Sequence, residues 1–219
     1  MCPGFPTGSE WRATGWPGGQ SRPSCGAGRV APRNNPPGAI QVGGQVYLRR
    51  PGARDRDEFL KLTRSSRRLH RSWVTPPVTS GQFEEFMQRS RRADVDVSLV
   101  CRLEDRAIVG VFILSQIFRR GFQNAYLGFY AGTAHAGRGY MGEGMQLLLR
   151  HVFRTLKLHR VEANVQPKNT RSIALIRRSG FSREGFSPRY LKVAGRWRDH
   201  QRWAITAEDW RRRLRSSSR

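Results

Sequence analysis

Hydrophobic and polar residues alternate in several stretches of this chain, and turn-forming residues bound most of these stretches. Such alternation predicts strands, because successive side chains of a strand point to opposite faces of a sheet. Three candidate strands follow one another in the middle of the chain, at residues 97–103, 107–118 and 124–130. A tight turn at Glu104-Asp105 separates the first two, which predicts that they pair antiparallel.

Apolar residues at helical spacing predict helices on both sides of these strands. The first helix should begin with Asp55 as its cap and run to about residue 66. A second helix should begin at the capping box of Thr79 and Gln82 and run to about residue 92. After the strands, apolar positions on one face predict a helix over residues 139–156.

The C-terminal part of the chain predicts a strand at residues 160–166, and then a short helix that ends at Gly180. Residues 181–193 and 197–205 predict a hairpin around Ala194-Gly195. With a short strand near residue 45, the element order is β-α-α-β-β-β-α-β-α-β-β. This order predicts an α+β (mixed α/β) domain with a central, mostly antiparallel sheet.

A glycine-rich stretch lies between the third middle strand and the helix that follows, and residues 128–144 read GFYAGTAHAGRGYMGEG. The first N–H groups of a helix have no partner within it, and the helix dipole is positive there. Gly137, Gly139 and Gly142 let the backbone approach a ligand closely, so a phosphate is the expected guest. Neither a Walker A motif nor a dinucleotide fingerprint is present. Taken alone, the stretch is equally consistent with a turn that only starts a helix.

The chain has 219 residues, with 40 Lys and Arg against 16 acidic residues, a net charge of +24 and a pI near 11.7. Such a charge favours polyanionic neighbours, so a weak ribosome or RNA contact through the basic surface is one expectation. The excess is almost all Arg and is spread along the chain, as GC-rich coding also produces. The net charge alone therefore does not decide whether the protein binds nucleic acid.

The three cysteines, Cys2, Cys25 and Cys101, form no C-x-x-C pair and are odd in number. They indicate neither a disulfide framework nor a metal site, and they fit a reducing compartment. The longest apolar run, residues 109–114, is far shorter than the roughly 20 residues that span a bilayer. Since no apolar segment of a signal peptide follows the N-terminus, we expect a cytoplasmic protein with no membrane partner.

Composition divides the chain into three parts. Residues 1–42 are rich in Gly, Pro, Ser and Arg, and they predict a disordered tail, or an over-long translation start. Residues 43–210 should form the domain. Residues 211–219 predict a solvated basic tail.

A motif within the glycine-rich stretch and a second one downstream together indicate which ligand the stretch binds. The run from Ala136 to Met141, AGRGYM, stands where an acyl-CoA signature Q/R-x-x-G-x-G/A would lie. Asn169-x-x-Ser172, followed by Gly180-Phe181, matches a second conserved segment. Residues 45–210 thus resemble the Gcn5-related N-acetyltransferase (GNAT) superfamily. The resemblance implies acetyl-CoA as co-substrate, no metal, and a sheet with a splayed strand pair flanked by helices.

Within the superfamily, four segments resemble the RimJ and RimL type of ribosomal-protein N-terminal acetyltransferases. These are Tyr126-Leu-Gly-Phe, Gly139-Tyr-Met-Gly-Glu143, Pro167-Lys-Asn169 and Trp197-Arg-Asp-His200. The resemblance implies an N-terminal Ala or Ser of a ribosomal protein as acceptor, and a monomer or homodimer. An acetyltransferase of a small amine, such as an antibiotic or polyamine, and an inactive ribosome- or RNA-binding module remain alternatives.

The resemblance also implies roles for individual residues. Pantetheine should pair with the strand at Phe129, Tyr130 and Ala131, where a backbone N–H near Tyr130 could bind the oxyanion. The pyrophosphate should lie on the loop formed by Gly137, Arg138, Gly139, Tyr140, Met141 and Gly142. Asn169 should bind the pantetheine arm, with Ser172 near the departing sulfur. The structural alternatives are a turn residue for Asn169 and a helix cap for Ser172.

Three positions depart from the family pattern. Ala136 and Met141 replace residues that contribute mainly backbone N–H groups, so cofactor binding should survive. Ile176 stands where many relatives carry a tyrosine that protonates the thiolate.

A general base is hard to identify, and the nearest candidates are Glu162, acting through water, and Asn164. An α-amine has a pKa of about 7.7 to 8.0, against about 10.4 for lysine. A site without a strong base therefore favours N-termini or weakly basic amines.

Overall fold

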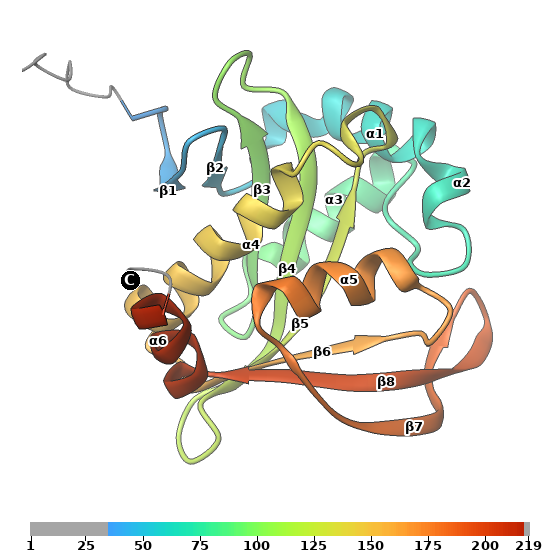
Figure 1. The fold of residues 1–219 in the computed structure, drawn as a ribbon. Helices are drawn as coiled ribbons and strands as arrows, with labels where there is room; N and C mark the ends of the chain where they lie inside the picture. The colour runs from blue at the N-terminus through green and yellow to red at the C-terminus, as the bar shows by residue number, and fades with distance from the viewer. Residues whose placement is uncertain (1–34, 217–219) are drawn as a thin grey trace, which may run out of the picture. The chain divides into compact units, whose positions relative to one another are not determined.

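A computed structural model describes residues 35–216 of the chain. Eight strands form one sheet in the spatial order β1-β2-β3-β4-β5-β6-β8-β7 (Figure 1). Every neighbouring pair is antiparallel except β5 and β6, which are parallel, so the predicted mostly antiparallel sheet is confirmed. The strands are β1 (Ala39–Val42), β2 (Val46–Arg49), β3 (Asp96–Arg102), β4 (Ile108–Phe118), β5 (Asn124–Ala131), β6 (Arg160–Val165), β7 (Ser182–Val193) and β8 (Arg196–Thr206).

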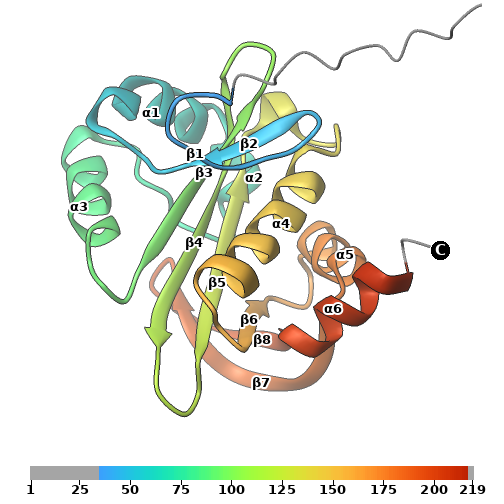
Figure 2. The ribbon, with the colours of Figure 1, turned by 90° about the vertical axis from the view of Figure 1, so that its left-hand side faces the viewer.

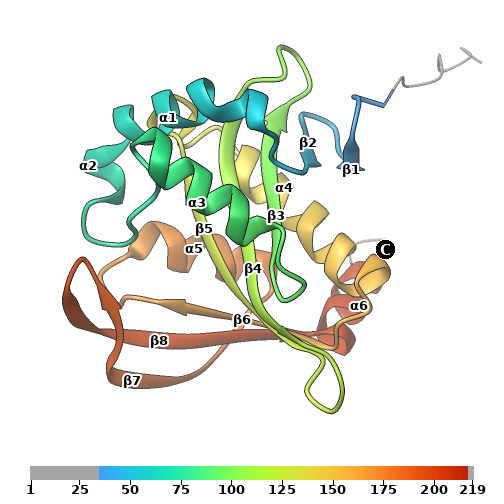
Figure 3. The same cartoon turned by 180° about the vertical axis from the view of Figure 1, so that it is seen from behind.

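Helices cover both faces of this sheet. Figure 2 shows α4 and α5 on one face, and Figure 3 shows α1 and α3 on the other. The helix predicted over residues 139–156 is α4 followed by a π-helical turn, His151–Thr155. The described α-helices are α1 (Arg56–Ser65), α2 (Arg67–His70), α3 (Ser80–Ser90), α4 (Tyr140–Arg150), α5 (Thr170–Ser179) and α6 (Ala207–Ser216).

Each layer of helices buries its own hydrophobic cluster against the sheet. Under α4, the buried residues include Met145, Leu148, Leu149 and Val152, and this spacing is the apolar face predicted from the sequence. Under α1 and α3, the ring of Phe59 lies 5.2 Å from Phe83 and 5.1 Å from Phe86, between ring centroids. The sheet is thus held rigidly from both sides, which fixes the strand that will border the site.

Strands β5 and β6 pair only at their first residues. The register joins Asn124 to Arg160 and ends with Tyr126 opposite Glu162. Beyond this point β5 continues to pair with β4, and β6 continues to pair with β8, but the two strands diverge from each other. The predicted splayed strand pair is therefore confirmed, and one edge of β5 has no partner strand from the described residues over positions 127–131.

Secondary structure extends beyond both predicted limits of the domain. β1 lies within residues 1–42, which were predicted to be disordered. These four residues form a strand because they pair with β2. Residues 1–34 lie outside the described part of the chain. At the other end, α6 reaches Ser216 instead of giving way to a basic tail after residue 210. The ring of Trp210 lies 5.4 Å from that of Phe153, which anchors α6 on the core. Residues 217–219 are not described.

Two of three predicted local signals have the expected roles. Thr79 Oγ1 accepts a bond from the Gln82 N–H at 3.3 Å, and Gln82 reciprocates, so the capping box is confirmed. Ala194 and Gly195 adopt φ of 48° and 77°, which form the predicted hairpin turn. Asp55 is the N-cap residue of α1, as predicted, but its side chain makes no capping bond. Its carboxylate instead pairs with the Arg49 guanidinium at 2.7 and 2.8 Å.

No helix between residues 35 and 216 combines the length and apolar character that crossing a bilayer requires.

Candidate active site

The loop between β5 and α4 presents a row of unpaired backbone N–H groups. Gly137 and Gly139 adopt φ of 81° and 84°, in the left-handed region that favours glycine. The Gly139 carbonyl accepts bonds from the N–H groups of Gly142 and Glu143 at 2.9 and 3.1 Å. Within the described residues, the five N–H groups of residues 137–141 have no acceptor. Together with the positive end of the α4 dipole, they form an anion site.

The side chain of Met141 points away from this loop and into the protein. A Cβ atom built on Gly110 of β4 would lie 2.4 Å from Met141 Sδ. Met141 therefore packs on the bare backbone of Gly110, while the Met141 N–H stays on the loop. In contrast, a Cβ on Gly137, Gly139 or Gly142 would meet nothing within 4 Å, so the outer side of the loop is open.

Strand alternation shows which backbone groups of β5 face the gap where β5 and β6 diverge. The N–H of Gly132 donates to Val109 on β4 at 2.9 Å, so residues 130 and 132 direct their backbone groups toward β4. Phe129 and Ala131 direct theirs to the opposite side, into the gap left by β6. The donors available to a ligand there are hence the N–H groups of these two residues, whereas the Tyr130 N–H points toward β4.

The second motif forms the start of α5. Asn169 is the N-cap residue, and its Oδ1 accepts a bond from the Ser172 N–H at 3.2 Å. Gly180 ends the helix with φ of 100°, as predicted for a C-terminal glycine. The cap occupies only the carbonyl oxygen of Asn169, so its amide NH₂ is available to a ligand.

A cavity of about 590 Å³ connects these elements. It lies among the loop, the free edge of β5, the first turns of α5, and α2. Of the predicted cofactor-binding residues, Arg138 does not line the cavity. Those that do are Phe129, Tyr130, Ala131, Gly137, Gly139, Tyr140, Met141, Gly142, Asn169 and Ser172.

Two groups of lining residues go beyond the predicted cofactor-binding set. The first comes from α2 and the turn after it: Leu69, His70 and Val74 were not predicted, whereas Trp73, between them, was expected from the sequence as a possible substrate contact or a packing residue. The second comes from α5: Arg171, Ala174, Leu175 and Arg178. The α5 group has the spacing of one helical face, so projecting this helix beyond Ser172 would have found it. The α2 group carries no comparable signal, because its position depends on tertiary packing.

His70 lines the cavity from α2, and its side chain is buried. Its Nε2 lies 2.8 Å from the carbonyl oxygen of Ala131. Since a carbonyl can only accept, Nε2 carries the proton and donates. Burial lowers the pKa of His70, so the ring is neutral near pH 7. Its Nδ1 is buried with no partner in the described structure. Burial also lowers the pKa of His135 on the loop side of the cavity, with a contribution from Arg102 and Arg138.

The two predicted base candidates do not line the cavity. Glu162 accepts a bond from Arg160 Nε at 2.9 Å, on the segment of β6 that still pairs with β5. Asn164 lies two residues further along β6, and its Oδ1 is buried. Their roles in catalysis stay predictions without geometric support. Ile176 is fully buried in the core, away from the cavity wall.

The described residues contain no cluster of three or more His, Cys, Asp or Glu side chains that could hold a metal ion.

The sequence model of the acetyltransferase (GNAT) domain matches residues 45–182, which is more than half of the chain. The chain therefore belongs to the GNAT acetyltransferase family, and it is an acetyl-CoA-dependent N-acetyltransferase. The splayed sheet and the glycine-rich loop are the features of the fold that fit this class.

Curated relatives extend the match. The probable N-acetyltransferase YjcK of Bacillus subtilis is 30% identical over 175 residues, covering 76% of this chain and 97% of that protein. The ribosomal protein uS5 alanine N-acetyltransferase of Escherichia coli is 39% identical over 107 residues, covering 49% of this chain and 55% of that protein.

Solved structures share the fold. RimJ of Mycobacterium smegmatis in complex with CoA-disulfide has a TM-score of 0.71 and 26% identity, covering 82% of this chain and 95% of that one. The spermidine N-acetyltransferase of Vibrio cholerae in complex with CoA and spermine has a TM-score of 0.67 at 20% identity, covering 77% and 99%. The second match concerns the fold alone.

Proposed function

We propose that this enzyme acetylates the N-terminal α-amine of a protein, with Ala or Ser as the first residue and a ribosomal protein as the substrate. Acetyl-CoA is the acetyl donor. The proposal depends on how the cavity would bind the donor, and on which amine its wall can activate.

The cavity has complements for the phosphates, the pantetheine arm and the thioester of acetyl-CoA. The unpaired N–H groups of residues 137–141 suit the pyrophosphate. The unpaired edge of β5 offers the Phe129 and Ala131 N–H groups to the amides of pantetheine and to the thioester oxygen. Arg171 and Arg178 on the α5 wall add positive charge, which suits the phosphates.

The reaction moves one acetyl group and one proton. The amine nitrogen attacks the thioester carbon, a C–N bond forms and the C–S bond breaks. The ammonium intermediate loses one proton and the departing thiolate gains one. A backbone N–H at the β5 edge would stabilise the oxyanion, and the Ser172 hydroxyl is the candidate donor near the sulfur. Positioning the two reactants side by side supplies much of the acceleration.

The residues of the cavity wall are the observation that favours an α-amine as the acceptor. Among the described residues that line the cavity, none is Asp or Glu. A wall without a carboxylate has no carboxylate base to deprotonate an ammonium group. It therefore suits an amine that is already partly neutral. At pH 7 roughly a tenth of an α-amine is neutral, against well under a thousandth of a lysine side chain, from pKa values of about 7.7 to 8.0 and 10.4.

Two relatives support the finer assignment. The Escherichia coli relative is described as an alanine N-acetyltransferase of ribosomal protein uS5, and the Mycobacterium smegmatis structure is described as RimJ. The segments whose sequence resembles the Rim type include Trp197, which is exposed on β8. An exposed tryptophan is available for a protein partner.

An assay with paired peptides tests the proposal. After acetyl-CoA binding has been measured by calorimetry, peptides with free Ala or Ser N-termini are compared with the same peptides blocked at the N-terminus and carrying a lysine. Mass spectrometry of fragments identifies the acetylated nitrogen. We expect acetylation of the free α-amine. Exclusive modification of lysine would refute the proposal.

A small polyamine is the second candidate, because the Vibrio cholerae neighbour is a spermidine acetyltransferase. The arginines of the cavity wall oppose a polycation. Adding spermidine as a substrate in the same assay decides between the two candidates.

A further inference from the structure

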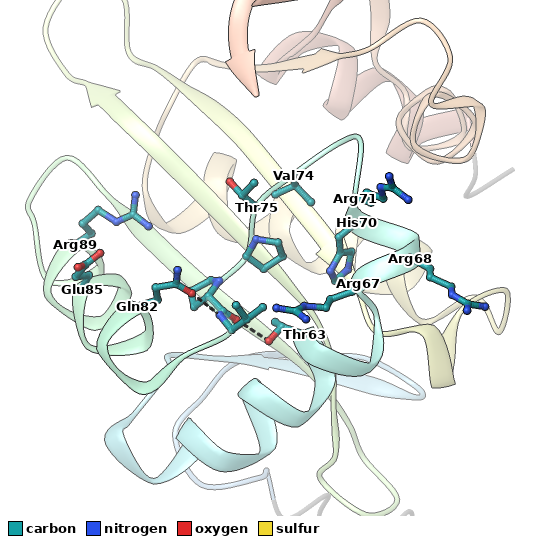
Figure 4. Close-up of a pocket in the computed structure, with 13 residues that line it drawn as sticks. Thr63, Arg67, Arg68, His70, Arg71, Val74, Thr75, Gln82, Glu85 and Arg89 are labelled. Atoms are coloured by element: carbon teal, nitrogen blue, oxygen red, sulfur yellow. Dashed lines mark hydrogen bonds between the residues drawn. The ribbon is translucent and has the colours of Figure 1, made fainter. Parts of the chain in front are cut away.

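A second cavity, of about 640 Å³, opens beside the first. It lies between α1, α2, α3 and the segment of residues 74–78 (Figure 4). His70 and Val74 line both cavities, so the two share a wall. The shared wall lies at the β5 edge, because His70 is bonded to Ala131. The second cavity therefore adjoins the place where the thioester would lie.

Hydrogen bonds fix the outer wall of this cavity. Thr63 Oγ1 donates to the Pro77 carbonyl at 2.6 Å, and Arg64 Nε donates to the Val78 carbonyl at 2.7 Å. Gln82 accepts a bond from the Val78 N–H at 2.8 Å. Two prolines, Pro76 and Pro77, further stiffen the segment. The cavity is thus formed before any ligand binds, which lowers the entropic cost of binding.

Positive charge dominates the cavity. Four arginines line it, Arg67, Arg68, Arg71 and Arg89, against one carboxylate, Glu85. Within the described residues, none of these five side chains takes part in an ion pair.

Two of these arginines point toward the space between the walls. In Figure 4, Arg67 and Arg89 extend toward each other from α2 and α3, whereas Arg68 and Arg71 point outward. The charge of Arg89 also reaches the buried Tyr130 hydroxyl, where it opposes the rise in pKa that burial causes. Arg67 and Arg89 are hence placed to bind an anion inside the cavity, close to β5.

We propose that this cavity binds the residues that follow the acceptor amine, and that Arg67 and Arg89 select acidic side chains among them. The inference rests on the proposed function and names its substrate class: proteins whose N-terminal Ala or Ser is followed by Asp or Glu. Three extended residues span about 10 Å. A pocket of this volume holds a ligand of that size.

The experiment measures kcat/KM for three peptides that share an N-terminal Ala and differ only at positions two and three. These positions are Asp-Glu, Asn-Gln or Lys-Lys. For the natural chain we expect kcat/KM for the acidic peptide to exceed that for the neutral one by about ten-fold, as one charge-assisted pair would give. The basic peptide should be the poorest substrate.

A double variant, Arg67→Gln with Arg89→Gln, should bring the acidic-to-neutral ratio close to one. It should leave the affinity for acetyl-CoA unchanged, because neither arginine lines the first cavity, and this shows that the variant is folded. The matched control is Arg68→Gln with Arg91→Gln, where Arg91 is the exposed residue that follows α3. It removes the same charge without changing the two inward side chains. It should keep the preference.

Equal kcat/KM for acidic and neutral peptides in the natural chain overturns this inference and leaves the proposed function standing. Loss of the preference in the control variant as well also overturns it, because the effect would then be one of overall charge. Acetylation of spermidine with no α-amine acetylated overturns both proposals.

Discussion

Gly139 meets two requirements at one position: its φ is positive, and within the described residues its N–H has no acceptor. We predict that Gly139→Asp weakens acetyl-CoA binding by at least about ten-fold, because a carboxylate would lie next to the phosphates. Gly139→Asn is the matched control, since Asn has the same shape, tolerates positive φ and carries no charge. Calorimetric titration measures both affinities. Equal affinity for the Asp and Asn variants would contradict a phosphate site on this loop.

Two buried histidines should make the folded protein less stable in acid. Burial lowers the pKa of both His70 and His200 below the ordinary value of 6.5. Above this value both rings are neutral in the folded and unfolded chain, so they add no pH dependence. As the pH falls below about 6.5, the unfolded chain gains protons that the folded chain does not, and the free energy of unfolding decreases.

His200→Gln should therefore flatten the loss of stability between pH 7 and pH 5, as measured by urea denaturation. The slope with pH is the decisive quantity, because a merely structural loss would shift all values equally. An unchanged slope would show that His200 does not contribute.

At the scale of elements, the contact between β4 and the start of α4 rests on one glycine. A Cβ on Gly110 would lie 2.4 Å from Met141 Sδ and 2.9 Å from the Tyr130 carbonyl oxygen. We predict that Gly110→Ala lowers the free energy of unfolding by about 1 to 3 kcal/mol, the usual cost of overpacking. Gly128→Ala on β5 is the control, because its Cβ would meet only the Ile113 carbonyl oxygen at 4.0 Å.

Adding Met141→Ala to Gly110→Ala should recover part of the loss, since the flexible half of the clash disappears while the backbone half remains. Urea denaturation of the two single variants and the double variant measures this coupling. Additive losses would mean that the two residues do not touch.

Elements with strong local signals were the ones predicted well. The capping box of Thr79 and the turn at Gly195 each depend on residues within four positions. Helix α2, in contrast, has four residues and no apolar periodicity, so the sequence did not predict it. It is held in place by contacts from afar, among them the His70 bond to Ala131.

At the scale of the whole molecule, the net charge of +24 should affect the use of an anionic co-substrate. We predict that KM for acetyl-CoA rises from low to physiological ionic strength, because salt screens the attraction that brings the cofactor in. The kcat at saturating acetyl-CoA should stay constant and serves as the control. A KM that does not change with salt would show that the charge is without influence on cofactor capture.

The sequence by itself determined the parts of this protein that depend on near neighbours in the chain. The glycines at 137 and 139 require positive φ, and Asn169 caps the helix that it precedes. The order of the elements predicted the fold class, and the family resemblance carried by these motifs implied the cofactor class. Both depend on backbone conformation and helix ends, which are local properties. Tertiary structure alone decided which side chains meet across the cavities. In the folded chain Glu162 does not line the first cavity, whereas His70 does, and Arg67 and Arg89 line the second. Packing of α2 and α3 on the sheet joins these residues, which are far apart in the chain.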